Sequence, residues 1–394
     1  MTRAEAGSSP LALSADEQAH TDRVLQRVSD AIAAHDGWLP FDEYMNLVLY
    51  EPGLGYYSAG AIKIGAGGDF VTAPEISPLF GHCVARQCAE FLQGTAGELL
   101  ELGAGTGRLA ADVLTELARL GALPSRYSIL EISAELRERQ QRALASLPSA
   151  LQSRVQWLDS LPAAPMSGLI LANEVADALP VERFVVSGTG VAAEGVGRSA
   201  TGALECSTRP APAALQAEFA RLEASLPAPL PSGYRSEICP RLDAFVHSLA
   251  DCVREGAVLL FDYGLGRAER YHPQRDAGTL QCHFRHRAHG DPLLHPGLQD
   301  ITAWVDFTRL AEAAARSGLH VAGYCTQAAF LLASGIESEL AGITAQAERA
   351  RRASEARQLL LPGELGETFK AMALTRAANQ SPSGFTVQDL RRLL

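Results

Sequence analysis

The first eighty residues contain two predicted helices and a long glycine-rich segment. Ser14 and Glu17 have the spacing of a capping box, and apolar residues at helical spacing behind them predict a helix that ends at Gly37. A second short helix is predicted at 41–50. Residues 51–81 are rich in glycine and aromatic residues and lack helical periodicity. A segment of this length and composition is usually functional or mobile.

From residue 98 onward, short apolar segments alternate with amphipathic helices. A helix is predicted at 304–317, and strands are predicted at 98–102, 127–132, 155–158, 168–172, 257–261, 319–325 and 368–375. This alternation is typical of a parallel, doubly wound sheet of the α/β class. Residues 187–208 predict hairpins outside the main sheet, and the proline-rich segment 226–233 predicts a connector.

The composition excludes several classes of protein. Of the 394 residues, 47 % are hydrophobic and 20 % are charged, so the chain can bury a large core. The net charge of −11 argues against a broad surface for nucleic acid. No apolar run reaches the roughly 18 residues of a membrane helix, and residues 1–19 lack the apolar core of a signal peptide. Seven scattered cysteines without a C-x-x-C pair are typical of a reduced, cytoplasmic protein.

A glycine turn follows the first of these strands, where residues 101–107 are ELGAGTG. Glycine has no Cβ, so a ligand can approach the backbone closely, and the next helix begins with unpaired N–H groups. A dinucleotide turn needs G-x-G-x-x-G, but Arg108 occupies the position of the last glycine. The turn therefore favours S-adenosylmethionine, with a nicotinamide-dependent oxidoreductase as an alternative. The residues expected to contact the cofactor are Glu101, Gly103, Ala104, Gly105 and Gly107.

Two acids at the ends of the next strands are further candidates for cofactor binding. Glu131, at the end of the second strand, is placed to accept hydrogen bonds from ribose hydroxyl groups, with an ordinary surface acid as the alternative. Asp159 lies just past the third strand. We expect Asp159 at the amino group of the adenine, with a loop acid or helix cap as an equal alternative.

Several separated segments point to one family. They are LYEPGLGYY at 49–57, GDFVTAPEIS at 68–77, ELGAGTG at 101–107, NEVADALP at 173–180, DYG at 262–264, DIT at 300–302 and VDF at 305–307. The chain in these segments resembles the MidA-type S-adenosylmethionine-dependent methyltransferases, which include a mitochondrial complex I assembly factor. Val175 and Ala176 are a departure, because members often carry paired aromatic residues there.

The resemblance implies a fold, a cofactor and a reaction. The fold is a class I methyltransferase with a Rossmann-like doubly wound sheet, an N-terminal helical cap and large insertions. The cofactor is S-adenosyl-L-methionine, and the reaction is methylation of an arginine side chain in a partner protein, such as a respiratory complex I subunit. Two other functions stay open. One is a cofactor-binding assembly chaperone without methyl transfer, and the other is a methyltransferase with a small-molecule acceptor.

The acids of the fourth segment are the candidate catalytic residues. They lie just beyond the fourth predicted strand, at the edge of an open sheet where substrates bind. A carboxylate pair can hold a guanidinium group in a bidentate manner and help to remove a proton. We therefore expect Glu174 or Asp177 to orient the substrate nitrogen and Asn173 to shape the pocket. Capping of the following turn is the alternative for both acids.

The GDFVTAPEIS segment is expected to fold over the cofactor. Its candidate binding residues are Gly68, Asp69, Thr72, Pro74 and Glu75. Residues 72–75 also fit the start of a helix, and both roles can hold together. The histidine-rich segment 282–295 lacks the spacing of a structural zinc site, so no metal is expected, and we interpret it as a basic loop that meets a protein partner.

The predicted organisation has four parts. Residues 1–97 form the helical cap and glycine-rich loop, and residues 98–180 form the cofactor-binding half of the methyltransferase domain. Residues 181–255 form an insertion subdomain. Residues 256–394 complete the sheet and contain a second insertion at 264–300. The expected partners are a protein substrate and, as a further possibility, a second copy of the chain in a homodimer, with no nucleic acid and no membrane insertion.

Overall fold

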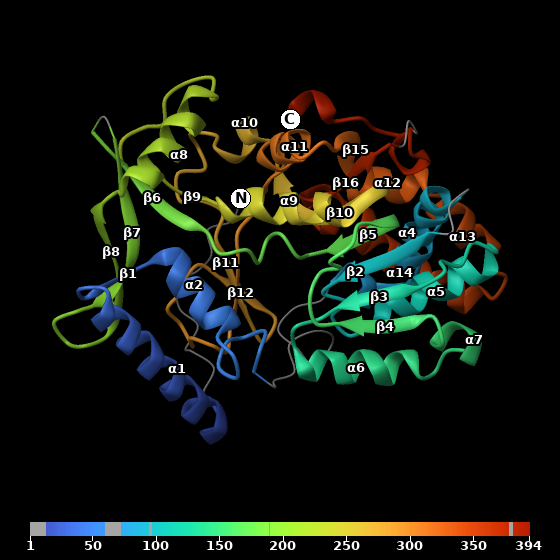
Figure 1. Ribbon diagram of the computed structural model, residues 1–394, viewed down its shortest axis with the longest axis horizontal. Coiled ribbons are helices and arrows are strands. Elements are labelled where there is room, and N and C mark those ends of the chain that lie inside the picture. The colour runs from blue at the N-terminus through green and yellow to red at the C-terminus, as the bar shows by residue number, and fades with distance from the viewer. Residues whose placement is uncertain (1–12, 60–71, 94–96, 189, 378–380) are drawn as a thin grey trace.

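The computed structural model describes residues 13–59, 72–93, 97–188, 190–377 and 381–394 (Figure 1). Two of the candidate cofactor-binding residues, Gly68 and Asp69, lie outside the described residues. In the part of the chain that is described, no helix is long and apolar enough to cross a membrane.

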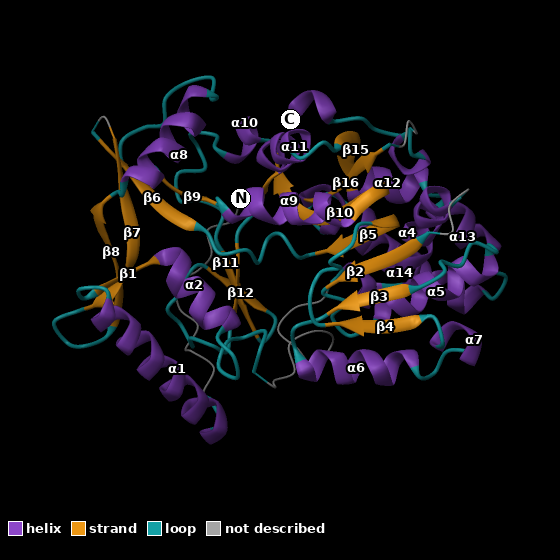
Figure 2. Cartoon of the chain, in the orientation of Figure 1, coloured by secondary structure: helices purple, strands orange, loops and turns teal. Residues whose placement is uncertain are grey.

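The main sheet has the strand order β15-β16-β10-β5-β2-β3-β4 (Figure 2). Strand β14 also pairs with β10. The bounds are β2 Glu98–Leu102, β3 Tyr127–Leu130, β4 Val155–Leu158, β5 Met166–Asn173, β10 Val253–Leu265, β14 Val305–Asp306, β15 His320–Thr326 and β16 Phe369–Arg376. All seven strands predicted from the sequence belong to this sheet. Strand β3 ends at Leu130, two residues earlier than predicted, because Glu131 turns to accept the N–H of Ser133 (2.9 Å).

The prediction of a parallel sheet is wrong for its last strand. Strand β16 is antiparallel to both of its neighbours, β10 and β15, whereas β10, β5, β2, β3 and β4 pair in parallel. The apolar pattern of a buried strand is the same in either direction, so the sequence of 368–375 does not show whether the strand runs parallel or antiparallel to its neighbours. Alternation of strands and helices therefore predicted the sheet but not this reversal.

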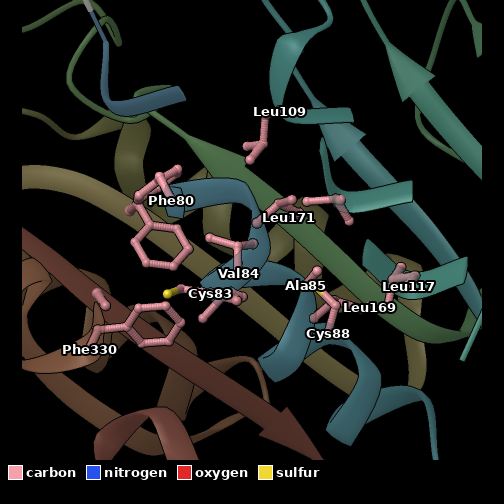
Figure 3. Packing of buried hydrophobic residues seen from close by; sticks show 14 of the residues in the cluster. Phe80, Cys83, Val84, Ala85, Cys88, Leu109, Leu117, Leu169, Leu171 and Phe330 are labelled. Carbon is pink, nitrogen blue, oxygen red and sulfur yellow. The ribbon is translucent and has the colours of Figure 1, made fainter. Parts of the chain in front are cut away.

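Helices cover both faces of the main sheet because successive strand residues point to opposite sides. In β10, Leu259 belongs to the core on one face and Leu260 to the core on the other. The first face is covered by α4 Pro78–Leu92, α5 Arg108–Arg119, α6 Ala134–Leu144, α7 Ser149–Gln152, α12 Gln327–Ala333, α13 Ile336–Gly342 and α14 Gln346–Leu360. Figure 3 shows Phe80 and Val84 of α4 and Phe330 of α12 in this core.

The second face is covered by α9 Arg241–Cys252 and α11 Phe307–Arg316. Helix α11 begins three residues later than the predicted helix at 304, because the side chain of Asp306 caps it by accepting the N–H of Arg309 (3.0 Å). Although α9 lies within the predicted insertion 181–255, its apolar side chains pack on the main sheet. The bounds of the four predicted parts otherwise stay a prediction.

The N-terminal helices are as predicted. Helix α1 Ala15–Ala34 begins with a capping box, in which the N–H of Ser14 donates to Glu17 Oε2 (2.7 Å) and the N–H of Glu17 donates to Ser14 Oγ (3.3 Å). Helix α2 Phe41–Tyr50 follows the short strand β1 Trp38–Pro40. Helix α2 lies between the main sheet and a second sheet (Figure 1).

The second sheet contains the predicted hairpins. Its order is β1-β7-β6-β9, with β8 also paired to β7. The bounds are β6 Glu182–Ser187, β7 Gly190–Arg198, β8 Leu204–Pro210 and β9 Arg235–Ile238, and helix α8 Ala213–Ala224 packs against it.

The third sheet lies mostly in the predicted second insertion at 264–300, and its strand β13 extends to Thr302. Its strands are β11 Gln281–Phe284, β12 Arg287–His289 and β13 Asp300–Thr302, in the order β12-β11-β13. The remaining elements are the short helices α3 Ala73–Ile76, α10 Arg267–Arg270 and α15 Leu365–Thr368 and the 3-10 turns Ser383–Phe385 and Arg391–Leu393.

Candidate functional site

A cavity of about 650 Å³ lies at the carboxyl ends of the central strands. Its lining includes residues of β2, β3, β5, β10 and β16, of α2, α3, α5, α6, α9 and α15, and of the third sheet. Among the residues that line it are Tyr50, Tyr57, Thr72, Pro74, Glu75, Glu101, Gly103, Ala104, Gly105, Glu131, Ile132, Asn173, Glu174, Asp177, Tyr263, Gln281, His283, Asp300, Trp304 and Phe369. The cavity thus collects most of the candidate residues from four separate segments of the chain.

The glycine turn between β2 and α5 forms one wall. Gly103 and Gly105 line the cavity in the left-handed backbone region, with φ of 59° and 53°. Gly107 does not line the cavity. Its φ is 85°, and a Cβ built on it would lie 2.9 Å from Cα of Gln140 in α6. We therefore assign Gly107 to the packing of the turn against α6, a contact between distant segments that the motif alone does not show.

Glu101 and Glu131 are held by hydrogen bonds within this wall. The hydroxyl of Tyr127 donates to Glu101 Oε2 (2.7 Å), and burial raises the pKa of Glu101 to about 7. Glu131 accepts at both oxygens, from the N–H of Ser133 (2.9 Å) and from Gln140 Nε2 (2.8 Å). Both carboxyl groups are therefore fixed at the edge of the cavity.

Gln140 lies behind this wall, buried and outside the cavity lining, and the sequence did not reveal its role. Its amide nitrogen donates to the carbonyl of Gly105 (3.0 Å) as well as to Glu131, and its Oε1 accepts from Trp157 Nε1 (2.9 Å). Gln140 thereby joins the glycine turn to the acid at the end of β3. Its position on α6 carries no motif, and only the fold brings it there.

Asp159 is not part of the cavity. Its side chain is 90 % exposed and pairs with Arg137 Nη2 at 2.7 Å. The structure therefore favours the loop-acid alternative for this residue. A strand-end position in the sequence fixes where Cα lies but not the direction of a side chain in the following loop.

The described part of the GDFVTAPEIS segment both starts a helix and lines the cavity. Helix α3 begins after Thr72, with Pro74 in its first turn. Thr72, Pro74 and Glu75 all contribute to the lining. The hydroxyl of Thr106 in the glycine turn donates to Glu75 Oε1, which ties α3 to the turn.

The residues after β5 form the opposite, acidic wall. Glu174 adopts a left-handed conformation with φ of 55°, which is unusual for a residue with a side chain. Its N–H donates to the carbonyl of Phe261 (2.8 Å), and Asn173 Nδ2 donates to Glu174 Oε1 (3.0 Å). Strained backbone of this kind persists where surrounding contacts fix it, and it concentrates at functional sites.

Burial without a basic partner raises the pKa of both acids. The pKa of Glu174 rises to about 8, chiefly through burial and then through the charge of Asp177. Burial raises the pKa of Asp177 to about 6, against the lowering effect of the Tyr263 hydroxyl. Oδ1 of Asp177 and Oδ1 of Asn173 are buried acceptors without a hydrogen-bond partner. This wall therefore has unused capacity to bind donors, which a cation with several N–H groups would satisfy.

Aromatic residues complete the site on the side away from the glycine turn. The rings of Tyr50 and Tyr57 stack with centroids 5.5 Å apart and planes at 25°. The hydroxyl of Tyr57 donates to Asp300 Oδ1 (2.8 Å), and that of Tyr50 donates to the carbonyl of Ala178 (2.8 Å). Among the described lining residues the one arginine or lysine is Arg108, which pairs with Asp112 at 3.0 Å.

These aromatic and acidic residues were missed as site residues. Tyr50, Tyr57, Tyr263 and Asp300 lie within the segments that carry the family resemblance, which was the available signal. The histidine-rich segment also contributes to the cavity, through His283 in β11. Burial lowers the pKa of His283, which favours its neutral form. No group of three or more metal-ligating side chains lies together in the described ranges of the chain.

Substitution of Glu174 by Gln is expected to stabilise the ligand-free protein at alkaline pH. The folded state holds the Glu174 proton up to a pKa of about 8, whereas the usual value is 4.5. The folded state therefore binds more protons than the unfolded chain between these values, and stability falls as the pH rises through this window. We expect the variant's free energy of unfolding to exceed that of the wild type by about 1–3 kcal/mol near pH 8.5. The difference should vanish near pH 4.

Urea denaturation of both proteins at the two pH values measures this effect. An equal loss of stability with rising pH in the two proteins would contradict the assignment of a raised pKa to Glu174.

Comparison with known proteins gives one family and two close structures. A family model described as "Putative S-adenosyl-L-methionine-dependent methyltransferase" matches residues 83–325. A crystal structure from Burkholderia thailandensis, bound to S-adenosyl-homocysteine, is 40 % identical with a TM-score of 0.92, over 98 % of this chain and 100 % of that one. A native crystal structure from the same organism is 39 % identical with a TM-score of 0.90, over the same shares of the two chains.

Curated relatives are similar over most of the chain. A Drosophila melanogaster protein named protein arginine methyltransferase NDUFAF7 homolog, mitochondrial, is 32 % identical, covering 86 % of this chain and 82 % of the relative. The Homo sapiens protein named protein arginine methyltransferase NDUFAF7, mitochondrial, is 28 % identical, covering 84 % of this chain and 79 % of the relative.

Proposed function

Because the chain belongs to this family of S-adenosyl-L-methionine-dependent methyltransferases, we propose that it methylates an arginine side chain of a partner protein. The observation that supports an arginine acceptor is the acidic wall, where Glu174 is half-buried, Asp177 is buried and Oδ1 of Asp177 has no hydrogen-bond partner. A guanidinium group offers five N–H donors and a positive charge, which match this wall. The names of the relatives support the same acceptor.

The residues present fit the cofactor. Gly103 and Gly105 leave bare backbone at the cavity, and Glu131 presents a fixed carboxyl group that can accept from ribose hydroxyl groups. Ile132 lines the cavity next to Glu131 and is 66 % exposed as a residue, so it offers an apolar surface for the adenine ring. When bound, S-adenosyl-L-methionine supplies a methyl group activated by a positively charged sulfur.

The acidic wall has three tasks in this proposal. Glu174 and Asp177 bind the guanidinium group and orient one nitrogen toward the cofactor side of the cavity. The positive charge of the bound guanidinium favours the ionised form of both acids, so it lowers their raised pKa values. A proton must leave the nitrogen that gains the methyl group, and Glu174 accepts it as a general base. Cofactor and acceptor bound together in the cavity exclude water from the reacting groups.

Labelling of a lysate tests the acceptor. We would incubate the purified protein and S-adenosylmethionine with a radiolabelled methyl group in a lysate from cells that lack the protein. We expect a labelled polypeptide that yields methylated arginine on hydrolysis, and no such label with the Glu174→Gln variant. Label on another amino acid would overturn the arginine acceptor, and label in a small molecule would identify a different substrate class. Cofactor binding without any label would favour the chaperone alternative.

We further propose that the substrate belongs to a respiratory complex and that the protein acts in the cytoplasm. The resemblance to a complex I assembly factor family supports the first statement, and the names of the relatives agree with an arginine acceptor. The seven cysteines, all free thiols, support a reducing compartment. Identification of the labelled polypeptide by mass spectrometry tests the first statement, and cell fractionation tests the second.

A further inference from the structure

The turn that carries the two acids is held by the neighbouring strand rather than by regular structure of its own. It spans residues 174–177, between β5 and the loop that leads to β6. At its start, the N–H of Glu174 donates to the carbonyl of Phe261 in β10 (2.8 Å). At its end, the carbonyl of Asp177 accepts the N–H of Ala303 (3.0 Å). The middle of the turn needs a further partner, because its N–H groups are buried.

Asp262 of β10 provides that partner. Its Oδ2 accepts the N–H of Ala176 (2.9 Å) and the N–H of Asp177 (3.3 Å), and its Oδ1 accepts the N–H of Tyr263 (2.9 Å). Asp262 is buried and is not among the residues that line the cavity. One carboxylate thus connects the acid-bearing turn to the strand that places Tyr263 in the cavity wall.

A buried carboxylate is expensive unless hydrogen bonds compensate for lost hydration. The hydrogen-bond donors to Asp262 are backbone amides, and burial together with repulsion from the neighbouring acids Asp177 and Glu174 raises its pKa well above the usual value. A neutral side chain would avoid this repulsion, so packing alone does not explain an acid at this position. The two amide bonds into the turn do explain it, because a carboxylate can accept several N–H groups at once.

We propose that Asp262 is a positioning residue, whose carboxylate fixes residues 174–177 so that Glu174 and Asp177 face the methyl acceptor. Asp262 itself touches neither acceptor nor cofactor. This inference rests on the proposed function for its effect on the rate, but the arrangement of the turn can be tested without any substrate.

Substitution of Asp262 by Asn tests the arrangement of the turn and the effect on the rate separately. Asparagine has one acceptor oxygen, and its amide group is a donor, so it cannot satisfy all three N–H groups. We expect faster hydrogen exchange in peptides that cover 174–177, unchanged exchange in the glycine turn at 101–107, and a dissociation constant for S-adenosyl-homocysteine within about twofold of the wild type. The rate of arginine labelling should fall by roughly 10²-fold, because a small displacement of aligned groups has an effect of this size. The pH dependence of the remaining rate should also shift.

Asp306→Asn is the matched control. Asp306 is also a buried acid that accepts a backbone N–H, but it caps α11 and does not line the cavity. We expect this variant to show unchanged hydrogen exchange at 174–177 and a labelling rate within about twofold of the wild type. If Asp262→Asn does not fold, Asp262→Ser removes the carboxylate without adding an amide donor, and the same measurements apply.

The outcomes distinguish the two proposals. Unchanged hydrogen exchange at 174–177, or faster exchange with an unchanged labelling rate and pH profile, would overturn the positioning role. Loss of cofactor binding together with activity would also overturn it, since Asp262 would then support the whole fold. If the wild-type protein labels no arginine, the proposed function fails. The hydrogen-exchange result then still decides whether Asp262 holds the turn.

Discussion

The Glu174→Gln variant is expected to lose methyl transfer by roughly 10²–10⁴-fold while it keeps its affinity for the cofactor. Glutamine retains the shape of the side chain and one acceptor oxygen, but it cannot carry a negative charge or accept a proton. Glu174 lies in the acidic wall, whereas the glycine turn and Glu131 form the cofactor side of the same cavity. The substitution should therefore raise KM for the acceptor and lower kcat together.

The labelling rate and the dissociation constant for S-adenosyl-homocysteine, measured on the same preparation, check this result. Glu364→Gln is the control, because Glu364 lines the cavity but is exposed. We expect its rate to stay within about twofold of the wild type. The same Glu174 variant is expected to be more stable than the wild type at alkaline pH, and an inactive but stabilised protein is typical of a residue kept for function. A Glu174 variant with wild-type turnover would remove this residue from the mechanism.

The second large effect is expected from Gly105→Val, which should weaken cofactor binding by more than about 100-fold. Gly105 has φ of 53°, a region that β-branched residues avoid, and it lines the cavity. Valine would shift the backbone of the turn and would also place side-chain atoms in the space of the ligand. Because the carbonyl of Gly105 accepts from Gln140, the shift would reach Glu131 as well.

Isothermal titration with S-adenosyl-homocysteine measures this effect, and Gly121→Val is the matched control. Gly121 also has a positive φ of 67°, but a Cβ built there meets nothing within 4 Å. Both variants carry the same kind of backbone strain, and only one carries it at the cavity. We expect the Gly121 variant to lose thermal stability and keep its affinity. Equal affinities in the two variants would show that the turn does not contact the cofactor.

Local features of the fold were predictable from the sequence because their causes are local. The capping box at Ser14 needs only residues three positions apart, and the glycine turn needs only the backbone freedom of its own residues. The acids after β5 were also predictable, because the carboxyl ends of parallel strands meet at one edge. The last two predictions placed residues on the cavity, although Gly107 of the glycine turn does not line it.

The aromatic side of the site, away from the glycine turn, could not be predicted in the same way. Tyr57 meets Asp300 across 243 positions in the sequence, and no spacing rule connects them. Gln140 was invisible for the same reason, since its role depends on the packing of α6 against the glycine turn. The antiparallel direction of β16 could not be predicted, because the sequence of a buried apolar strand does not indicate its direction in the sheet. Contacts made by the insertions and by the last strand therefore required the structure.

The place of β16 in the sheet has a consequence for synthesis of the chain. A ribosome makes β16 after β10 and β15, yet β16 occupies the gap between them. Until residue 376 has left the exit tunnel, a nascent chain has unpaired strand edges on both sides of that gap, which are prone to aggregation. Leu365, Thr368 and Phe369, which complete the cavity, also emerge late. We expect ribosome-bound chains that end before residue 369 to be unable to retain the cofactor and to depend on chaperones.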